Sequence, residues 1–153
     1  MRAGVFFFFG MRYNRYNGSG TSGAELEDVR KKRMKIMVID GNSILNRAYF
    51  GIRNLSNHEG TPTNAVYGFL STLFKQEDEE KPDRIVVCFD VKEKTFRHKK
   101  FDFYKATRKP MEENLAVQLP IIKEVLDALG IVRCEMAGYE ADDLLGTISR
   151  RAN

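Results

Sequence analysis

Acidic side chains stand at three places in the sequence where a short apolar run ends. One aspartate follows the run 35–39, a second follows 84–89, and a group of three follows 131–136. The residues are Asp40, Asp90, Glu140, Asp142 and Asp143. Carboxylates that lie a few ångströms apart repel one another and do not all ionise cheaply. A divalent cation removes this repulsion, and Mg²⁺ or Mn²⁺ prefers oxygen ligands. The pattern therefore predicts a site for one of these ions, which can lower the pKa of a bound water and clamp a phosphoryl group.

Each of these carboxylates also has a purely structural explanation. An aspartate after a strand is often a turn residue or a helix cap, and Asp142 and Asp143 at the start of a helix suit its dipole. Asn42 or Ser43 would equally serve as a helix cap. The recurrence of acidic residues after three successive runs favours metal binding over three unrelated structural roles.

A basic segment follows the second acidic position and reads TFRHKKFDFYKATRKP from Thr95 to Pro110. Within 92–109, eight basic residues face only two acidic ones. Aromatic residues are interleaved with the basic ones, and such a mixture suits a nucleic-acid strand, because cations contact phosphates and rings stack on bases. A solvated charged connection is the alternative. His98 is interpreted as another polar member of the segment and not as a ligand.

The positive charge of the whole chain comes from its beginning. The formal net charge is +4 over 153 residues, and residues 1–33 carry seven basic and three acidic residues. Since the chain holds 25 basic and 21 acidic residues, eighteen of each remain in 34–153. Residues 1–33 include the flexible stretch 18–23 and are predicted to be a disordered extension. The apolar run Phe6–Phe9 is too short to indicate a signal peptide. The folded domain is expected over 34–153.

Alternating strand and helix patterns must position the acidic residues. Strands are predicted at 35–39, 84–89 and 131–136, and helices at 43–52, 63–76, 115–129 and 140–150. Pro120 either kinks the third helix or lies in its first turn. This order predicts an α/β fold with a parallel sheet and helices on both faces. Ligands bind at the carboxyl ends of such strands, which is where the carboxylates fall.

The remaining composition points to a cytoplasmic protein. No stretch approaches the roughly 20 apolar residues that span a bilayer, so no membrane association is expected. Cys88 and Cys134 lie in predicted strands and are interpreted as buried, reduced thiols. The cytosol is the default compartment for such a chain.

Four segments together resemble the 5′-3′ exonuclease domain at the N-terminus of bacterial DNA polymerase I, in the flap-endonuclease or 5′-nuclease group. They are VIDGNSILNRAYF (38–50), PTNAVYGFL (62–70), VVCFDVKEKTFRHKKFDFYKATRKP (86–110) and GYEADDLLGTISRRA (138–152). The resemblance covers 34–153 and implies a PIN-like 5′-nuclease fold, with residues 92–111 in the arch beneath which a single-stranded 5′ arm passes. Phe103 stands where the family usually has a glycine.

The resemblance also implies roles for individual residues. The first metal cluster of the family falls on the five carboxylates, with Mg²⁺ or Mn²⁺ as cofactor. Lys105 and Arg108 correspond to catalytic residues that polarise the scissile phosphate. DNA contacts are implied for Arg47, Arg97, Tyr104, Lys105 and Arg108. The family has a second group of aspartates and a helix–hairpin–helix region further along, so the C-terminal part of the domain is expected to be missing.

Three functions remain open from the sequence. The first is a divalent-metal-dependent 5′-3′ exonuclease or 5′-flap endonuclease of DNA replication and repair, acting as a monomer on DNA with a 5′ end or flap and needing no organic cofactor. The second is a non-catalytic, truncated DNA-binding module. The third is a related ribonuclease, although such domains lack a long basic arch.

Overall fold

A four-stranded sheet forms the centre of the computed structural model, which describes residues 6–12, 33–101, 103–105, 107 and 110–152. The strand order is β1-β2-β3-β4. The strands are β1 (Phe6–Arg12), β2 (Arg33–Asp40), β3 (Arg84–Cys88) and β4 (Val132–Cys134). The pairs β2–β3 and β3–β4 are parallel, as predicted, whereas β1 pairs antiparallel with β2.

The two central strands are apolar because both of their faces are covered. Met37, Val38 and Ile39 in β2 are all 0% exposed, and such continuous apolar runs are typical of parallel strands between two helical layers. The register pairs Asp40 with Cys88. Since Asp90 follows Cys88 by two residues, both aspartates leave the sheet at its carboxyl edge.

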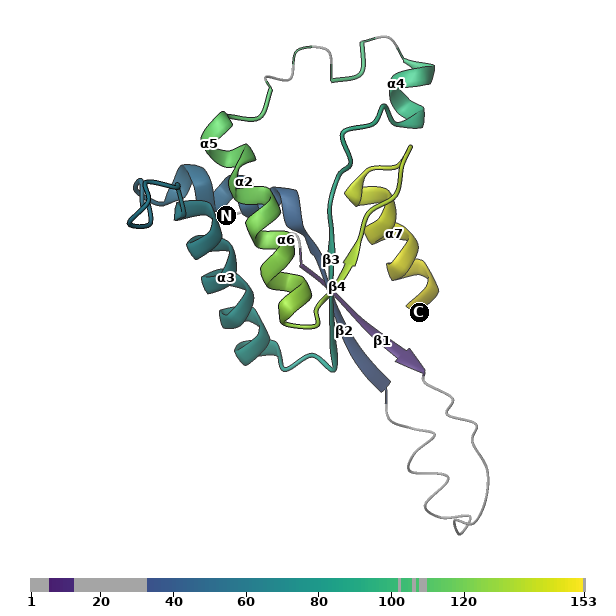
Figure 1. Ribbon diagram of the computed structural model, residues 1–153. Helices are drawn as coiled ribbons and strands as arrows, with labels where there is room; N and C mark the ends of the chain where they lie inside the picture. Colours follow the sequence, from purple (N-terminus) through teal and green to yellow (C-terminus); the bar gives the residue numbers. More distant parts are fainter. Residues whose placement is uncertain (1–5, 13–32, 102, 106, 108–109, 153) are drawn as a thin grey trace.

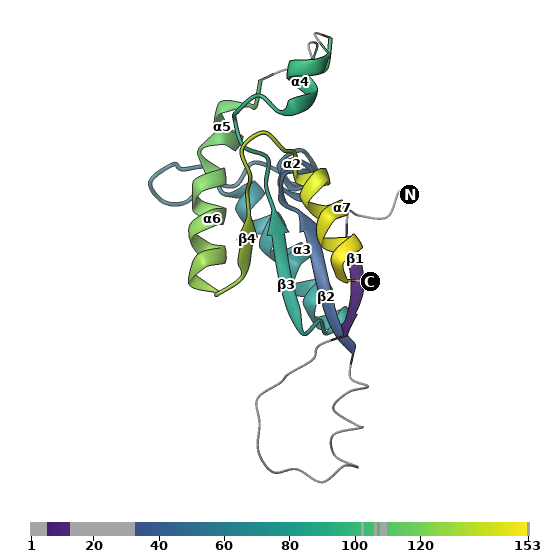
Figure 2. The same ribbon diagram turned by 90° about the vertical axis from the view of Figure 1, so that its right-hand side faces the viewer.

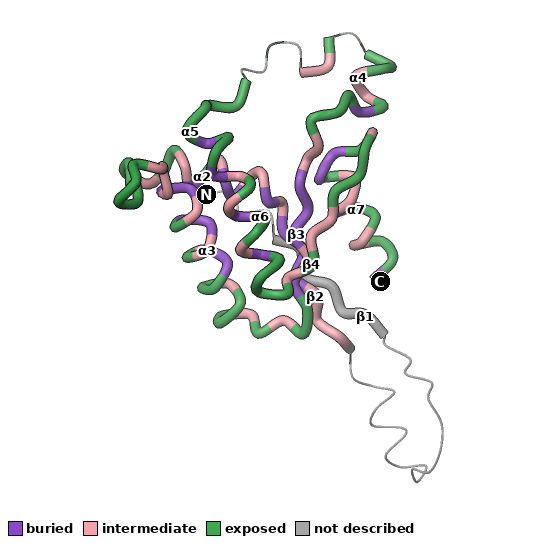
Figure 3. The backbone as a smooth tube through the Cα atoms, viewed as in Figure 1, coloured by how far each residue is buried: buried purple, intermediate pink, exposed green. Residues whose placement is uncertain are grey.

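Helices cover both faces of the sheet, which confirms the expected α/β architecture (Figures 1 and 2). The larger core cluster joins β2 and β3 to helices on one face, and the smaller one joins them to a single helix on the other. The first group is α2 (Gly41–Gly51), α3 (Asn64–Glu80), α5 (Glu113–Ala116) and α6 (Gln118–Ala128). The single helix is α7 (Ala141–Ala152). Buried residues therefore lie along the strands and on the inward sides of these helices (Figure 3).

The first strand corrects one prediction. Residues 1–33 were expected to be disordered, but Phe6–Arg12 forms β1 along the outer edge of β2. The run is rich in phenylalanine, which favours strands, and it pairs with an edge whose backbone N–H and C=O groups need partners. Residues 1–5 and 13–32 lie outside the described residues.

The predicted helix 115–129 is divided into α5 and α6 at Val117. Pro120 lies in the first turn of α6, where the missing N–H costs no helical hydrogen bond. The division places Gln118 against α3. The Gln118 side-chain oxygen accepts from the N–H groups of Ala65 and Val66 at 2.8 and 3.2 Å, and its amide donates to Asn64 at 3.0 Å.

The basic segment bridges the carboxyl edge of the sheet between β3 and α5 (Figure 1). Its described helix is the single turn α4 (Phe96–Lys100). No helix in the described ranges of the chain is both long and apolar enough to cross a membrane.

Candidate metal and phosphate site at the carboxyl edge of the sheet

Four of the five predicted carboxylates line one cavity at the carboxyl edge of the sheet. Its volume is about 250 Å³. The lining residues are Asp40, Asn42, Ser43, Asn46, Asp90, Lys105, Glu140 and Asp142. The cavity thus gathers residues from the end of β2, the start of α2, the end of β3, the basic segment and the start of α7.

Asp40 acts as the N-cap of α2, in place of the Asn42 or Ser43 cap considered from the sequence. Its Oδ1 accepts from the Ser43 N–H at 2.9 Å. Burial raises the pKa of the Asp40 carboxyl, and the negative charges of Asp142 and Asp90 raise it further, against the opposing effect of the Ser43 N–H. The carboxylates are therefore close enough to disfavour one another's ionisation, which is the condition that a cation relieves.

Asp90 is fixed by the start of α7. Its Oδ1 accepts from the Ala141 N–H at 2.7 Å. Phe89, just before it, is completely buried, and its ring lies so close to Gly41 that a Cβ on Gly41 would come within 2.7 Å of ring atoms. Glycine at this position therefore allows the ends of β2 and β3 to approach each other.

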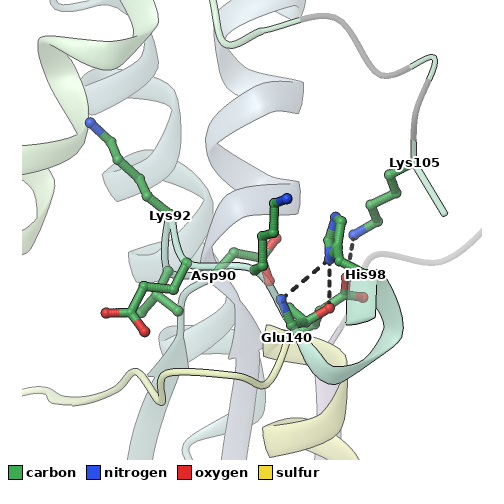
Figure 4. Close-up of a pocket in the computed structure, with 9 residues that line it drawn as sticks. Asp90, Lys92, His98, Lys105 and Glu140 are labelled. Atoms are coloured by element: carbon green, nitrogen blue, oxygen red, sulfur yellow. Dashed lines mark hydrogen bonds and ion pairs between the residues drawn. The ribbon is translucent and has the colours of Figure 1, made fainter. Parts of the chain in front are cut away.

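The negative charge of Glu140 is balanced by the basic segment. It is 6% exposed, and it accepts from Lys105 Nζ at 2.9 Å and from the Tyr104 hydroxyl at 2.8 Å. Burial opposes its ionisation, but the hydrogen bonds from Lys105 and Tyr104 outweigh burial and lower the pKa of Glu140. A second cavity of about 250 Å³ shares Asp90, Lys105 and Glu140 with the first. Figure 4 shows Lys105 and Glu140 pointing toward each other there, while Lys92 points away.

Lys105 has a backbone conformation that suits a functional site. Its φ of 56° lies in the left-handed region, which non-glycine residues rarely adopt and which carries a strain of about 1–3 kcal/mol. In this conformation the ammonium group is hydrogen-bonded to Glu140, and the side chain is 30% exposed.

Asp143 differs from the other four carboxylates. Arg97 donates to its two oxygens at 2.7 and 2.6 Å. These hydrogen bonds hold the pKa of Asp143 below its usual range. Asp143 does not line the first cavity; its carboxylate lies beside Glu140, whose N–H it accepts at 3.0 Å, and is paired with Arg97.

The chemistry of the cavity fits a divalent ion, although the carboxylates are not gathered tightly. Among the described residues, no three His, Cys, Asp or Glu side chains are already arranged around one point as metal ligands. The donors that line the cavity are hard oxygens, which Mg²⁺ and Mn²⁺ prefer. The Asn42 Oδ1 is buried and has no hydrogen-bond partner among the residues that the structure describes, and an ion or one of its waters would satisfy it. Asp40, Asp90 and Asp142 are therefore the residues best placed to hold an ion.

Two of the other predicted DNA-binding residues contact carboxylates of the site: Arg97 contacts Asp143 and Tyr104 contacts Glu140. Arg47 is exposed on α2. Arg108 lies outside the described residues. Phe101 and Phe103 are 62% and 92% exposed, and exposed rings beside cations are typical of surfaces on which bases stack.

Two residues that stabilise the basic segment were not identified from the sequence. Thr95 is 4% exposed, and both its N–H and its hydroxyl contact His98 Nδ1, at 3.3 and 2.8 Å. The His98 ring lies edge-on to the Tyr104 ring at 5.2 Å between centroids. The spacing Thr-x-x-His resembles a helix capping box and was the signal that could have revealed this contact.

Comparison with known proteins agrees with this geometry. Residues 35–153 match the family model described as "5′-3′ exonuclease, N-terminal resolvase-like domain". The chain is 46% identical over 121 residues to DNA polymerase I of Bacillus subtilis, covering 79% of the chain and 14% of the relative. It is 45% identical over 115 residues to that of Caldicellulosiruptor bescii, covering 75% and 14%.

A third relative, the thermostable DNA polymerase I of Thermus aquaticus, is 39% identical over 118 residues, covering 77% of the chain and 14% of the relative. The chain thus spans about one seventh of the length of these relatives. The family model covers most of the chain and includes all five carboxylates. The chain therefore belongs to the 5′-3′ exonuclease family, and residues 35–153 form its N-terminal resolvase-like domain.

Proposed function

We propose that this domain hydrolyses DNA phosphodiester bonds at 5′ ends or 5′ flaps with the help of Mg²⁺ or Mn²⁺. The observation that carries the proposal is the shared cavity of Asp40, Asp90, Glu140 and Asp142, with Lys105 at its rim. Membership of the family and the DNA polymerase I relatives support a role in DNA replication and repair. We infer that the domain acts as a monomer in the cytoplasm.

Three carboxylates are proposed to hold the metal. Asp40 and Asp90 end adjacent parallel strands, and Asp142 faces them from the start of α7. The raised pKa of Asp40, caused by burial and then by its acidic neighbours, supports the view that this group of anions lacks a compensating charge. A divalent ion bound there supplies Lewis acidity and a water of lowered pKa.

Lys105 is proposed to serve the scissile phosphate. Its ammonium group donates to Glu140 at 2.9 Å and lines the cavity, where it would also contact a phosphate oxygen of bound DNA. A cation aimed at charge that develops in the transition state is worth about 10²–10³-fold in rate. Arg108 is proposed to act beside it, on the resemblance alone.

The remaining basic and aromatic residues are proposed to bind the DNA. Arg47 is exposed on α2, one residue after the cavity-lining Asn46, and the Tyr104 hydroxyl donates to Glu140, which also lines the cavity. Phosphate contacts of this kind position a strand without reading its sequence. The exposed rings of Phe101 and Phe103 suit stacking against an unpaired 5′ arm.

A second candidate is a DNA-binding module without catalysis. It is favoured by the ion pairs of Lys105 with Glu140 and of Arg97 with Asp143, because they neutralise two carboxylates without a metal. This candidate predicts salt-sensitive DNA binding and no hydrolysis.

Cleavage of a 5′-flap substrate distinguishes the two candidates. The purified chain is incubated with an end-labelled flap duplex in Mg²⁺, in Mn²⁺ and in EDTA, alongside Asp90→Asn. Asp127→Asn is the matched control, since Asp127 is exposed on α6 and its ion-pair partner is Arg133 on β4. The proposal predicts metal-dependent cleavage by the parent chain and the control and its loss in Asp90→Asn. Equal cleavage by all three would reject this site, and cleavage by none would favour the binding module.

A further inference from the structure

The start of the basic segment is fixed to the loop that precedes α7. The Phe96 N–H donates to the Gly138 carbonyl at 2.9 Å, and the Phe96 ring lies 5.9 Å from the Tyr139 ring. The Arg97 guanidinium lies over the Phe96 ring at 4.6 Å. Backbone, ring and cation contacts therefore act together at this point of the segment.

The strongest contact between the start of the basic segment and α7 is the ion pair between Arg97 and Asp143. Two parallel hydrogen bonds of 2.6–2.7 Å join the guanidinium to the carboxylate, which is the bidentate geometry that arginine forms best. The two side chains are 29% and 19% exposed. Partial burial makes such a pair stronger than a surface ion pair, because solvent screens it less.

The oxygens of Asp143 are already engaged. Besides the two Arg97 donors, its Oδ2 accepts from the Glu140 N–H at 3.0 Å. Metal coordination by Asp143 would require breaking a bidentate ion pair, and the neighbouring Asp142 already faces the cavity. Two adjacent aspartates therefore have different surroundings.

We infer that Asp143 is a positioning residue and not a metal ligand: through Arg97 it fixes the basic segment so that Tyr104 and Lys105 lie over Glu140. The inference rests on the proposed metal site. It also gives Arg97 a role as the ion-pair partner of Asp143. This role differs from the direct DNA contact that the family resemblance implies. Arg97 Nη1 lies 3.6 Å from Glu140 Oε2, so the same guanidinium adds positive charge where Lys105 and Tyr104 contact Glu140.

Binding of Mn²⁺ separates the two aspartates. Free Mn²⁺ is measured by electron paramagnetic resonance in titrations of the parent chain, Asp142→Asn and Asp143→Asn. The two variants carry the same change, from a carboxylate to an amide, at adjacent positions. Asp142→Asn should weaken Mn²⁺ binding by at least about tenfold, equivalent to about 1.4 kcal/mol. Asp143→Asn should weaken it by less than about threefold, or about 0.7 kcal/mol. Equal loss in the two variants would overturn the inference.

Amide hydrogen exchange tests the positioning role without metal. Exchange of the α4 amides should accelerate in Arg97→Gln and in Asp143→Asn, and the double variant should be no faster than either single variant, because all three lack the same ion pair. Asp142→Asn should leave α4 exchange unchanged. Additive acceleration in the double variant, or unchanged exchange in both single variants, would refute the inference. If the parent chain bound no Mn²⁺, the proposed function would fail, and the exchange result alone would decide the positioning role.

Discussion

The close approach of Gly41 to Phe89 gives the clearest link between packing and the site. A Cβ added to Gly41 would come within 2.7 Å of three ring atoms of Phe89, whereas ordinary contacts are 3.4–4 Å. In Gly41→Ala, the new methyl group and the Phe89 ring must therefore move apart by at least 0.7 Å. Phe89 is fully buried and stacks on Phe69 at 6.5 Å between centroids, so its ring has little room to yield.

The separation must be taken up partly by the backbone, next to the two aspartates. Gly41 follows Asp40 and Phe89 precedes Asp90, so the variant increases the distance between the carboxylates. Overpacking of a well-filled core costs about 1–3 kcal/mol, and a misplacement of about 1 Å in an active site reduces the rate by about 10²-fold. We expect Gly41→Ala to lose about 1–3 kcal/mol of unfolding free energy and to cleave flaps more slowly by about one to two orders of magnitude.

Gly51→Ala is the matched control. Gly51 lies at the other end of α2, and a Cβ there would have no neighbour within 4 Å. Alanine favours a helix over glycine by up to about 1 kcal/mol, so this variant should be at least as stable as the parent and equally active. Urea unfolding and flap cleavage are measured for both variants. If Gly41→Ala matched Gly51→Ala in both assays, the reasoning about this contact would be wrong.

Other parts of the structure give further expectations. Gln118→Met keeps the side-chain volume but leaves buried N–H groups of α3 without an acceptor, which should lower the unfolding free energy by about 2–4 kcal/mol in urea. Hydrogen bonds from Arg97 lower the pKa of Asp143, so their pair stabilises the fold above about pH 4 and this contribution is lost as the pH falls through the lowered value. Arg97→Gln should therefore flatten the dependence of stability on pH below about pH 5, and an unchanged profile would exclude this linkage. Burial raises the pKa of the Cys88 thiol to about 12, so iodoacetamide should leave Cys88 unmodified at pH 8 until the protein unfolds; rapid labelling of the folded protein would contradict its burial.

Much of the fold could be predicted from local patterns. The runs that became β2 and β3 are apolar because both faces are buried, and a single chain shows this directly as continuous hydrophobicity. Asp40 and Asp90 end these runs, so their meeting at one edge follows from parallel pairing. The pairing of β1 with β2 could not be predicted in this way, because the partner of an edge strand depends on which edge is open and not on the sequence of the strand.

The distinction between Asp142 and Asp143 also required the structure. Both stand in the first turn of α7, and their spacing from the strand differs by one residue. About 100° of rotation per residue in a helix directs them to different neighbours, one to the cavity and the other to Arg97. Arg97 lies 46 residues away in the chain, so no local pattern reveals the pair. The capping of α3 by Gln118 was missed for the same reason.

The central claim is that Asp40, Asp90 and Asp142 jointly bind a divalent cation, and diffraction from a crystal soaked in Mn²⁺ tests it most directly. The claim predicts an anomalous scattering peak in the cavity, at about 2.0–2.6 Å from carboxylate oxygens of Asp40 or Asp90. A well-occupied peak elsewhere, with no peak in this cavity at saturating Mn²⁺, would contradict the account.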